Sequence, residues 1–318
     1  MAQLTAGVDL GGTKIQTALL RSRTVAGSTR VPTPQTGPAD VVTAIVGTIR
    51  DALKQAGAPA TDLGGVGIGS PGEIDGEAGA VSNSPNLPGF RERVRLGPLV
   101  SRRLRGVPVT LDNDVRVAVL GEFRRGAGRP YRDFLGVFVG TGVGGGLILG
   151  GKLREGRGGA GEIGHTVVQD GGRRCGCGRR GCLEAYAGRG SMERTARRWQ
   201  DRGHKTVLFD VMKDKGADRL TSGVIAAALK EKDRMARRLV DEAVWALGIA
   251  LASAQNVLDL EAIIVGGGLG DRLGQPFVAG VAEAMYPHLF VSDRPPAVLG
   301  TELGDLSGAV GAAVRAGG

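Results

Sequence analysis

The sequence predicts an α/β protein of two lobes. The chain has 318 residues, which exceeds the usual size of a single hydrophobic core. A pattern of strand, glycine-rich loop and second strand occurs near the N-terminus and again near residue 140, and segments with helical spacing of apolar residues lie between such strands. We expect an N-terminal lobe over residues 1–122, completed by a C-terminal helix at 304–318, and a second lobe over residues 123–303.

The composition is that of an ordinary globular protein, with 42% hydrophobic and 23% charged residues. We find no early apolar segment with a cleavage site and no apolar run long enough for a membrane span, so we expect a cytoplasmic protein without a membrane partner. The net charge is +9, but the arginines are scattered among acidic residues and aromatic residues make up only 4%. Stacking platforms for bases are therefore scarce, and the sequence predicts no nucleic-acid partner.

The first half of the chain alternates strands and helices. Short apolar runs that end at turn residues predict strands at 4–10, 15–20, 66–69 and 107–111. Apolar residues with helical spacing, from Val42 to Leu53, predict a helix over 39–56. Asn113 and Asp114 follow the last of these strands, where a side chain can cap a helix that runs to about Arg125.

The second half repeats the opening pattern and adds longer helices. Strands are predicted at 134–139, 147–149 and 262–265, the last closed by a glycine turn at 266–268. Helices are predicted at 191–202, 234–258 and 306–316. Trp199 and Trp245 lie on amphipathic helices, and we expect both to pack in the core.

The two glycine-rich loops, at 11–14 and 140–146, have the character of phosphate-binding turns. Glycine leaves backbone N–H groups unhindered, so that they can point at phosphate oxygens. Rossmann and Walker loops lead from a strand into a helix, whereas both loops here lead from strand to strand. Two such hairpins are what actin/hexokinase-like kinases use. Asp9 at the mouth of the first loop favours this interpretation over two ordinary hairpins.

All three cysteines of the chain fall within eight residues, and a histidine precedes them. Thiolate and imidazole are the preferred ligands of zinc, and four of them form a closed tetrahedral structural site. The sequence predicts such a site at the loop 165–182, with the ligands His165, Cys175, Cys177 and Cys182. The alternative is a glycine-rich loop with incidental thiols.

Together these motifs resemble the ROK family of bacterial sugar kinases and related repressors. The resemblance is carried by Asp-x-Gly-Gly-Thr-Lys at 9–14, Asn-Asp at 113–114, Gly-Thr-Gly-x-Gly-Gly-Gly at 140–146, Glu-x-Gly-His at 162–165 and Cys-x-Cys-Gly-x-x-Gly-Cys-x-Glu at 175–184. It extends from Gly7 to the glycines at 266–268. The last two motifs are highly specific together, whereas the glycine loops are not. The chain departs from the family pattern at Phe90 and at Val115-Arg116.

The resemblance implies a two-lobed actin/hexokinase-like (ribonuclease H-like) fold with an inserted zinc-binding loop. It also implies an ATP-dependent hexokinase that phosphorylates the 6-hydroxyl of a hexose, with glucose as the expected substrate. Structural Zn²⁺ and ATP-bound Mg²⁺ are the implied cofactors, and a homodimer is the implied assembly.

The resemblance also assigns roles to single residues. Asp114 is the implied catalytic base. The implied sugar-binding residues are Gly72, Asn113, Asp114, Glu162, His165 and Glu184. The implied ATP-binding residues are Gly11, Gly12, Thr13, Lys14, Thr141, Gly142, Val143, Gly144, Gly267 and Gly268. Asp9 is the implied magnesium ligand, and His165 is implied to serve both zinc and the sugar.

Several alternatives stay open. The substrate could be another hexose or an N-acetylhexosamine, and the donor could be polyphosphate. A sugar-sensing repressor of the same family is disfavoured, because the first phosphate loop follows so soon after residue 1 that a preceding DNA-binding domain has no room. A purely structural zinc protein would leave both hairpins and Asp114 unexplained.

Overall fold

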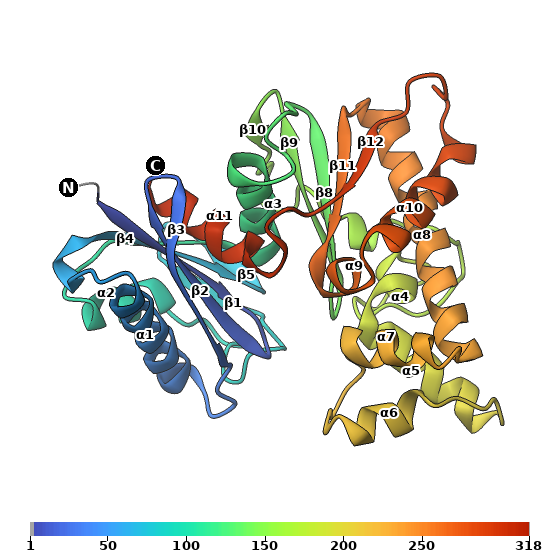
Figure 1. The fold of residues 1–318 in the computed structure, drawn as a ribbon, viewed down its shortest axis with the longest axis horizontal. Helices are drawn as coiled ribbons and strands as arrows, with labels where there is room; N and C mark the ends of the chain where they lie inside the picture. Colours follow the sequence, from blue (N-terminus) through green and yellow to red (C-terminus); the bar gives the residue numbers. More distant parts are fainter. Residues whose placement is uncertain (1–2, 318) are drawn as a thin grey trace. The chain divides into compact units, whose positions relative to one another are not determined.

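The computed structural model describes residues 3–317, and the chain divides into two compact units (Figure 1). One unit contains the chain up to Pro130 together with the segment from Glu302 onward, and the other contains Tyr131–Thr301. The predicted boundary at 122/123 lies inside the helix α3 (Asp114–Arg125). The structure keeps this helix whole, because its inner face packs within the first unit. It also places the second crossing at Thr301/Glu302 in place of 303/304.

The first unit is built on a five-stranded sheet with the order β3-β2-β1-β4-β7. Strands β1, β2 and β3 are antiparallel neighbours, whereas β4 and β7 run parallel to β1. This is the strand order and orientation of the predicted ribonuclease H-like fold. The strands are β1 (Leu4–Leu10), β2 (Lys14–Arg21), β3 (Thr24–Pro32), β4 (Leu63–Ser70) and β7 (Val109–Asn113), with a small hairpin of β5 (Glu73–Asp75) and β6 (Ala80–Ser82).

Helices cover both faces of this sheet (Figure 1). The helix α1 (Pro38–Gln55) buries the predicted apolar stripe from Val42 to Leu53, and α2 (Leu96–Arg103) lies beside it. On the other face, α11 (Ser307–Ala316) packs against β1, β4 and α3. Two short 3-10 turns, η1 (Ala60–Asp62) and η4 (Gly304–Leu306), complete the unit.

Glycines allow α11 to lie directly on the sheet. A Cβ atom added at Gly7 would come within 1.8 Å of the carbonyl oxygen of Ala309, and one at Gly67 within 1.8 Å of that of Ala312. On the helix side, a Cβ at Gly311 would come within 1.6 Å of the carbonyl oxygen of Val117 in α3. Side chains at these positions would force the layers apart, so glycine is required for the close approach.

The second unit repeats the sheet, with the order β10-β9-β8-β11-β12 and the same pattern of antiparallel and parallel neighbours. Its strands are β8 (Phe134–Val139), β9 (Val143–Leu149), β10 (Lys152–Leu153), β11 (Ala262–Gly266) and β12 (Ala297–Gly300). Its helices and 3-10 turns are η2 (Ile163–His165), α4 (Glu184–Ala187), α5 (Arg189–Asp201), α6 (Leu208–Asp214), α7 (Ser222–Lys230), α8 (Arg234–Leu258), α9 (Gly267–Leu273), α10 (Gln275–Met285) and η3 (Tyr286–His288).

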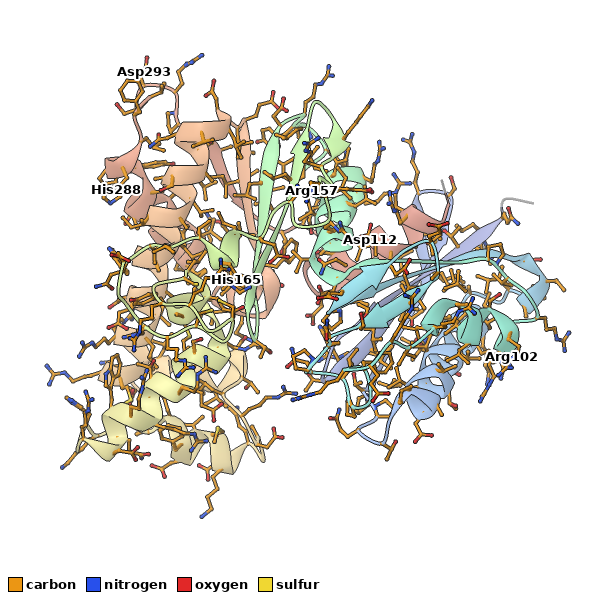
Figure 2. All side chains as sticks on the ribbon, turned by 180° about the vertical axis from the view of Figure 1, so that it is seen from behind. Arg102, Asp112, Arg157, His165, His288 and Asp293 are labelled. Carbon is orange, nitrogen blue, oxygen red and sulfur yellow. The ribbon has the colours of Figure 1, made fainter. Side chains whose placement is uncertain are left out.

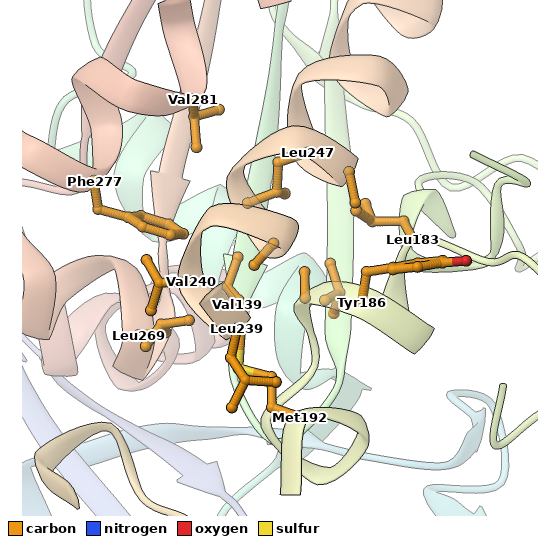
Figure 3. Packing of buried hydrophobic residues seen from close by; sticks show 14 of the residues in the cluster. Val139, Leu183, Tyr186, Met192, Leu239, Val240, Leu247, Leu269, Phe277 and Val281 are labelled. Carbon is orange, nitrogen blue, oxygen red and sulfur yellow. The ribbon is translucent and has the colours of Figure 1, made fainter. Parts of the chain in front are cut away.

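The core of the second unit gathers around α8 (Figure 3). Leu239 and Leu247 from this helix contact a buried cluster that includes Val139 of β8, Met192 of α5 and Phe277 of α10. The predicted helix at 234–258 is thereby confirmed as the central helix of the unit.

The expectation that both tryptophans are core residues holds only for Trp199, which packs partly buried against this cluster. Trp245 is 40% exposed, because it lies on the outer side of α8, where its ring makes a T-shaped contact with the ring of Tyr186. Among residues 3–317, no helix is both long and apolar enough to cross a membrane.

Candidate active site

The first glycine loop is a hairpin that joins β1 to β2, as predicted. The amide of Gly11 donates to the carbonyl of Lys14 at 2.9 Å, and Thr33 binds two carbonyls of the loop, those of Gly11 and Thr13. In the part of the chain that the structure describes, the amides of Gly12 and Thr13 at the tip have no protein acceptor. Unbonded amides at a glycine tip are the donors that a phosphate group requires.

Charged side chains surround this hairpin. The ammonium group of Lys14 lies 2.6 Å from the carboxylate of Asp305 in η4, which also approaches Arg30 at 3.3 Å. The pKa of Asp9 is raised to about 7, first by burial and then by the negative charge of Asp114, while Lys14 opposes the shift. Two neighbouring carboxylates that disfavour each other's ionisation form a donor set that fits a hard cation such as Mg²⁺.

Asn113 and Asp114 lie where β7 ends and α3 begins. The Asn113 side chain is the N-cap, because its Oδ1 accepts hydrogen bonds from the amides of Val115 and Arg116 at 3.0 and 3.1 Å. Asp114 occupies the first helical position, and its Oδ1 accepts a bond from the amide of Val115 at 2.9 Å. The capping role therefore belongs to Asn113, and the Asp114 carboxylate is not needed for it.

An ion cluster behind this turn holds it in place. Asp112, the buried residue that precedes Asn113, lies 2.7 Å from Arg116 of α3 and 3.4 Å from Arg315 of α11 (Figure 2). Its Oδ1 also accepts a bond from the amide of Asn113 at 2.7 Å. Arg116, one of the two departures from the family pattern at 115–116, thus ties the start of α3 to β7.

The second glycine loop joins β8 to β9 in the same way. Gly140 donates to the carbonyl of Gly142 at 2.8 Å, and within residues 3–317 the amides of Thr141 and Gly142 find no protein acceptor. Val143 and Gly144 lie in β9 itself, not in the loop. The amide of Val143 donates to Glu184 at 3.0 Å, so this predicted phosphate contact is already bonded within the protein.

Glu184 thereby links the hairpin to the cysteine loop. Its carboxylate comes so close to the hairpin that a Cβ at Gly142 would lie 2.3 Å from Oε2. The other oxygen, Oε1, lies 3.6 Å from Sγ of Cys175. A side chain at position 142 would displace this carboxylate, which gives a physical reason for the glycine.

The predicted zinc ligands converge. One ligand atom from each of His165, Cys175, Cys177 and Cys182 lies within 4.8 Å of the others, with His165 in η2 (Figure 2). The Sγ atoms of Cys177 and Cys182 are 3.7 Å apart, and Sγ of Cys175 is 3.9 Å from Nδ1 of His165. Tetrahedral Zn–S bonds of about 2.3 Å place two sulfurs about 3.8 Å apart. The four residues therefore fit a tetrahedral metal ion.

Tight turns build this cluster. The amide of Cys175 donates to the carbonyl of Arg179, and Gly178 donates back to Cys175. Gly178 and Gly181 adopt positive φ angles of 89° and 79°, which favour glycine. A hydrogen bond from Arg179 lowers the pKa of the Cys177 thiol to about 6, whereas burial raises that of Cys175 to about 12.

Of the remaining predicted residues, the glycines follow strands and Glu162 precedes a 3-10 turn. Gly72 follows β4 with a φ of 103°, and Glu162 precedes η2 with its side chain exposed. Gly267 and Gly268 form the first residues of α9, not the predicted turn. Gly267 has a φ of 79°, and a Cβ there would come within 2.7 Å of the amide of Val139. Glycine is needed there for close packing against β8.

Sequence reasoning missed three charged residues that organise these sites. Asp112 ends an apolar strand, and Glu122 interrupts the buried face of α3, so both stood out as charges among apolar neighbours. Glu122 is fully buried and accepts bonds from the amides of Ala127, Glu302 and Leu303 and from the Ser307 hydroxyl. Arg189 carried no comparable signal, since arginines are scattered throughout the chain.

The two sheets of equal order, each with a glycine hairpin whose tip amides are unbonded, define a protein of the actin/hexokinase-like class. The ROK family profile matches residues 5–317. Glucokinase from Thermotoga maritima is 34% identical over 289 residues, which cover 90% of this chain and 88% of that protein. Glucokinase from Streptomyces coelicolor is 34% identical over 317 residues, which cover 98% of this chain and 96% of that protein.

Solved structures agree with the family profile. A ROK family glucokinase from Streptomyces griseus, solved in complex with glucose and AMPPNP, matches with a TM-score of 0.82 and 33% identity over 98% of this chain and 99% of that chain. The chain belongs to the ROK family. The predicted membership and the predicted fold class are both confirmed.

Proposed function

We propose that the protein is an ATP-dependent hexokinase that transfers the γ-phosphoryl group of ATP to the 6-hydroxyl of a hexose, with glucose as the substrate. The observation that carries the proposal is the position of Asp114 beside Asp9 at the first hairpin. This carboxylate stands at the start of α3, and the capping of that helix is done by Asn113. Asp114 lies close enough to Asp9, beside the first hairpin, to influence its pKa.

The residues suit the chemistry of phosphoryl transfer, which requires positioning and charge neutralisation above all. In this proposal Asp114 accepts the proton of the attacking hydroxyl. The hairpin amides and Lys14 bind the donor phosphates, and Asp9 holds Mg²⁺, which neutralises phosphate charge when bound. Gly267 and Gly268 lie along the nucleotide. The relatives that are glucokinases, one of them bound to glucose and AMPPNP, support this donor and this sugar.

The sugar is proposed to be held by Gly72, Asn113, Glu162, His165 and Glu184. Glu184 is fixed by the amide of Val143, and His165 turns Nδ1 toward the cysteines, which leaves Nε2 for a hydroxyl. The metal proposed for the cysteine cluster is Zn²⁺, which when bound fixes the fold of the loop from which His165 and Glu184 project. By resemblance the proposal includes a cytoplasmic homodimer, which light scattering can measure.

A coupled assay of ADP release across a panel of hexoses tests the proposal. Purified protein with Mg-ATP and glucose should form glucose 6-phosphate and ADP. The same panel is repeated with N-acetylhexosamines as acceptors and with polyphosphate as the donor. If none of these sugars stimulates ADP release or consumes polyphosphate near neutral pH, the protein is not a sugar kinase.

A further inference from the structure

A guanidinium group lies beside the tip of the second hairpin, where no predicted residue provides a charge. The Nη1 atom of Arg189, the first residue of α5, donates to the Ser222 hydroxyl at 2.7 Å, and Nη2 approaches the Thr141 hydroxyl at 3.4 Å. Its backbone amide donates to the carbonyl of Gly140 at 3.1 Å. A Cβ added at Gly268 would lie 2.8 Å from Nη1. Arg189 therefore contacts both segments of this unit that are proposed to bind the nucleotide.

The charge of Arg189 is not balanced by the protein. Throughout residues 3–317, no carboxylate forms an ion pair with it, and its Nε atom is buried without a hydrogen-bond partner. Burial, and then the positive charge of Arg219, lower the pKa of Arg189. An arginine nevertheless stays protonated at neutral pH. A shielded cation beside a second cation is costly unless an anion joins them.

The groups around Arg189 also identify the kind of anion. The tip supplies the unbonded amides of Thr141 and Gly142, and the guanidinium group of Arg189 supplies further N–H donors. A ligand that satisfies them must offer several acceptor oxygens and negative charge, and guanidinium groups match phosphate oxygens in shape as well as charge.

We propose that Arg189, together with the hairpin tip at Thr141 and Gly142, forms a subsite for the phosphate chain of the donor, with Arg219 as a neighbouring positive charge. The proposal rests on the proposed function and adds to it a residue that recognises the donor. Ser222 and Thr141 hold the guanidinium in place through their hydroxyl groups. The shared chemistry is a chain of phosphates, which a nucleoside triphosphate and inorganic polyphosphate both provide.

Direct binding tests the subsite without relying on catalysis. Isothermal titration calorimetry would measure tripolyphosphate, AMP and ATP binding to the wild type, Arg189→Gln and Arg189→Lys. Arg198→Ala is the matched control, because Arg198 is an exposed arginine of the same helix and, among residues 3–317, its hydrogen bonds stay within that helix. Circular dichroism verifies the fold, and glucose binding verifies the sugar site.

Arg189→Gln should weaken tripolyphosphate and ATP binding by about 10–100-fold, as expected for lost hydrogen bonds to a charged group. AMP and glucose binding should change little, Arg189→Lys should restore part of the affinity, and Arg198→Ala should match the wild type. In the wild type, phosphoryl transfer from ATP or from polyphosphate then distinguishes the two sources.

Two results would overturn the subsite. If Arg189→Gln and Arg189→Lys fold and bind tripolyphosphate and ATP like the wild type, the arginine has only a structural role, and the kinase proposal is unaffected. If the wild type itself binds neither tripolyphosphate nor ATP, the subsite and the proposed function fail together. Should Arg189→Gln not fold, Arg189→Lys and Arg219→Ala give the same comparison.

Discussion

Asp114 is the residue on which the proposed chemistry depends. Asparagine at this position keeps the shape and a hydrogen-bonding oxygen but cannot accept a proton. General-base contributions amount to about 10²–10⁴-fold, so Asp114→Asn should lower kcat by at least about 100-fold. The helix should be unaffected, since Asn113 provides the cap. Zinc content, ATP affinity and melting temperature should stay near the wild type, and sugar affinity should change less than kcat.

Asn113→Ala provides the matching control for the cap. It removes the acceptor for two amides of α3, which should reduce the free energy of unfolding by about 1 kcal/mol. Thermal melts of both variants separate the two roles, because only the loss of the cap should lower the melting temperature, and steady-state kinetics of Asp114→Asn then measure the contribution of the base. A fall in kcat smaller than about tenfold for Asp114→Asn would leave the base unidentified.

The raised pKa of Asp9 predicts how the stability of the metal-free protein depends on pH. Its pKa rises from 3.8 to about 7 on folding, so between these values the folded state binds more protons than the unfolded state. The free energy of unfolding therefore falls as pH rises through this window, by up to about 4 kcal/mol if the group titrates alone. Asp9→Asn should flatten this part of the pH profile in urea melts.

Magnesium provides the control for Asp9. Mg²⁺ should restore wild-type stability above pH 7 because it binds the ionised carboxylate, and it should have less effect on Asp9→Asn. A metal-free wild type whose stability rises steadily from pH 5 to pH 8 would contradict the role given to burial at this residue.

At the scale of single elements, the cysteine loop links the metal to stability. Cys177→Ser should lower zinc content, from about one ion per chain, and melting temperature together, because metal binding contributes to folding in a site of this kind. Asp170→Asn is the control, since Asp170 is an exposed residue before the first cysteine. Metal analysis and thermal melts measure both effects. Wild-type protein that is isolated without metal, yet folded and active, would show that the loop needs no ion.

The elements that the sequence predicted are those with a strong apolar pattern. The strands β1, β2 and β8 and the helices α1 and α8 agree closely with the expected ranges. The edge strand β3 was missed because none of its residues is buried, so it has no apolar alternation to reveal it. The start of α9 was predicted as a turn, because three consecutive glycines are typical of turns. In the structure Gly267 is the first residue of this helix, and close packing on β8 requires glycine there.

In the candidate site too, some features could be predicted from the sequence and others could not. The hairpins and the metal cluster could be predicted because local spacing determines them, and the structure brings the ligand atoms of the cluster together. Contacts between distant segments could not be predicted. Arg189 meets Ser222 and Thr141, and Glu122 meets residues 302–307, through tertiary packing that no local pattern records.

At the scale of the whole molecule, the C-terminal segment returns to the first unit and completes it. The segment from Glu302 passes back from Thr301, and α11 then covers the face of β1 and β4 with buried Ala309, Val310, Ala312 and Ala313. The carboxylate of Glu122 accepts three hydrogen bonds from this segment. The second unit, Tyr131–Thr301, contains its own core.

A chain truncated after Leu303 should therefore lose the first unit and keep the second. The truncation exposes the glycine-lined face of β1 and β4 to water and removes the Ser307 partner of Glu122, and unpaired buried groups cost about 1–3 kcal/mol each. Hydrogen exchange should show lost protection in β1, β4 and α3 but retained protection in β8, β11 and α8. A chain truncated after Ala316, which keeps all of α11, is the control and should exchange like the full-length protein. Equal protection of both units after truncation at Leu303 would mean that β1 and β4 fold without α11 and that this helix does not stabilise the sheet.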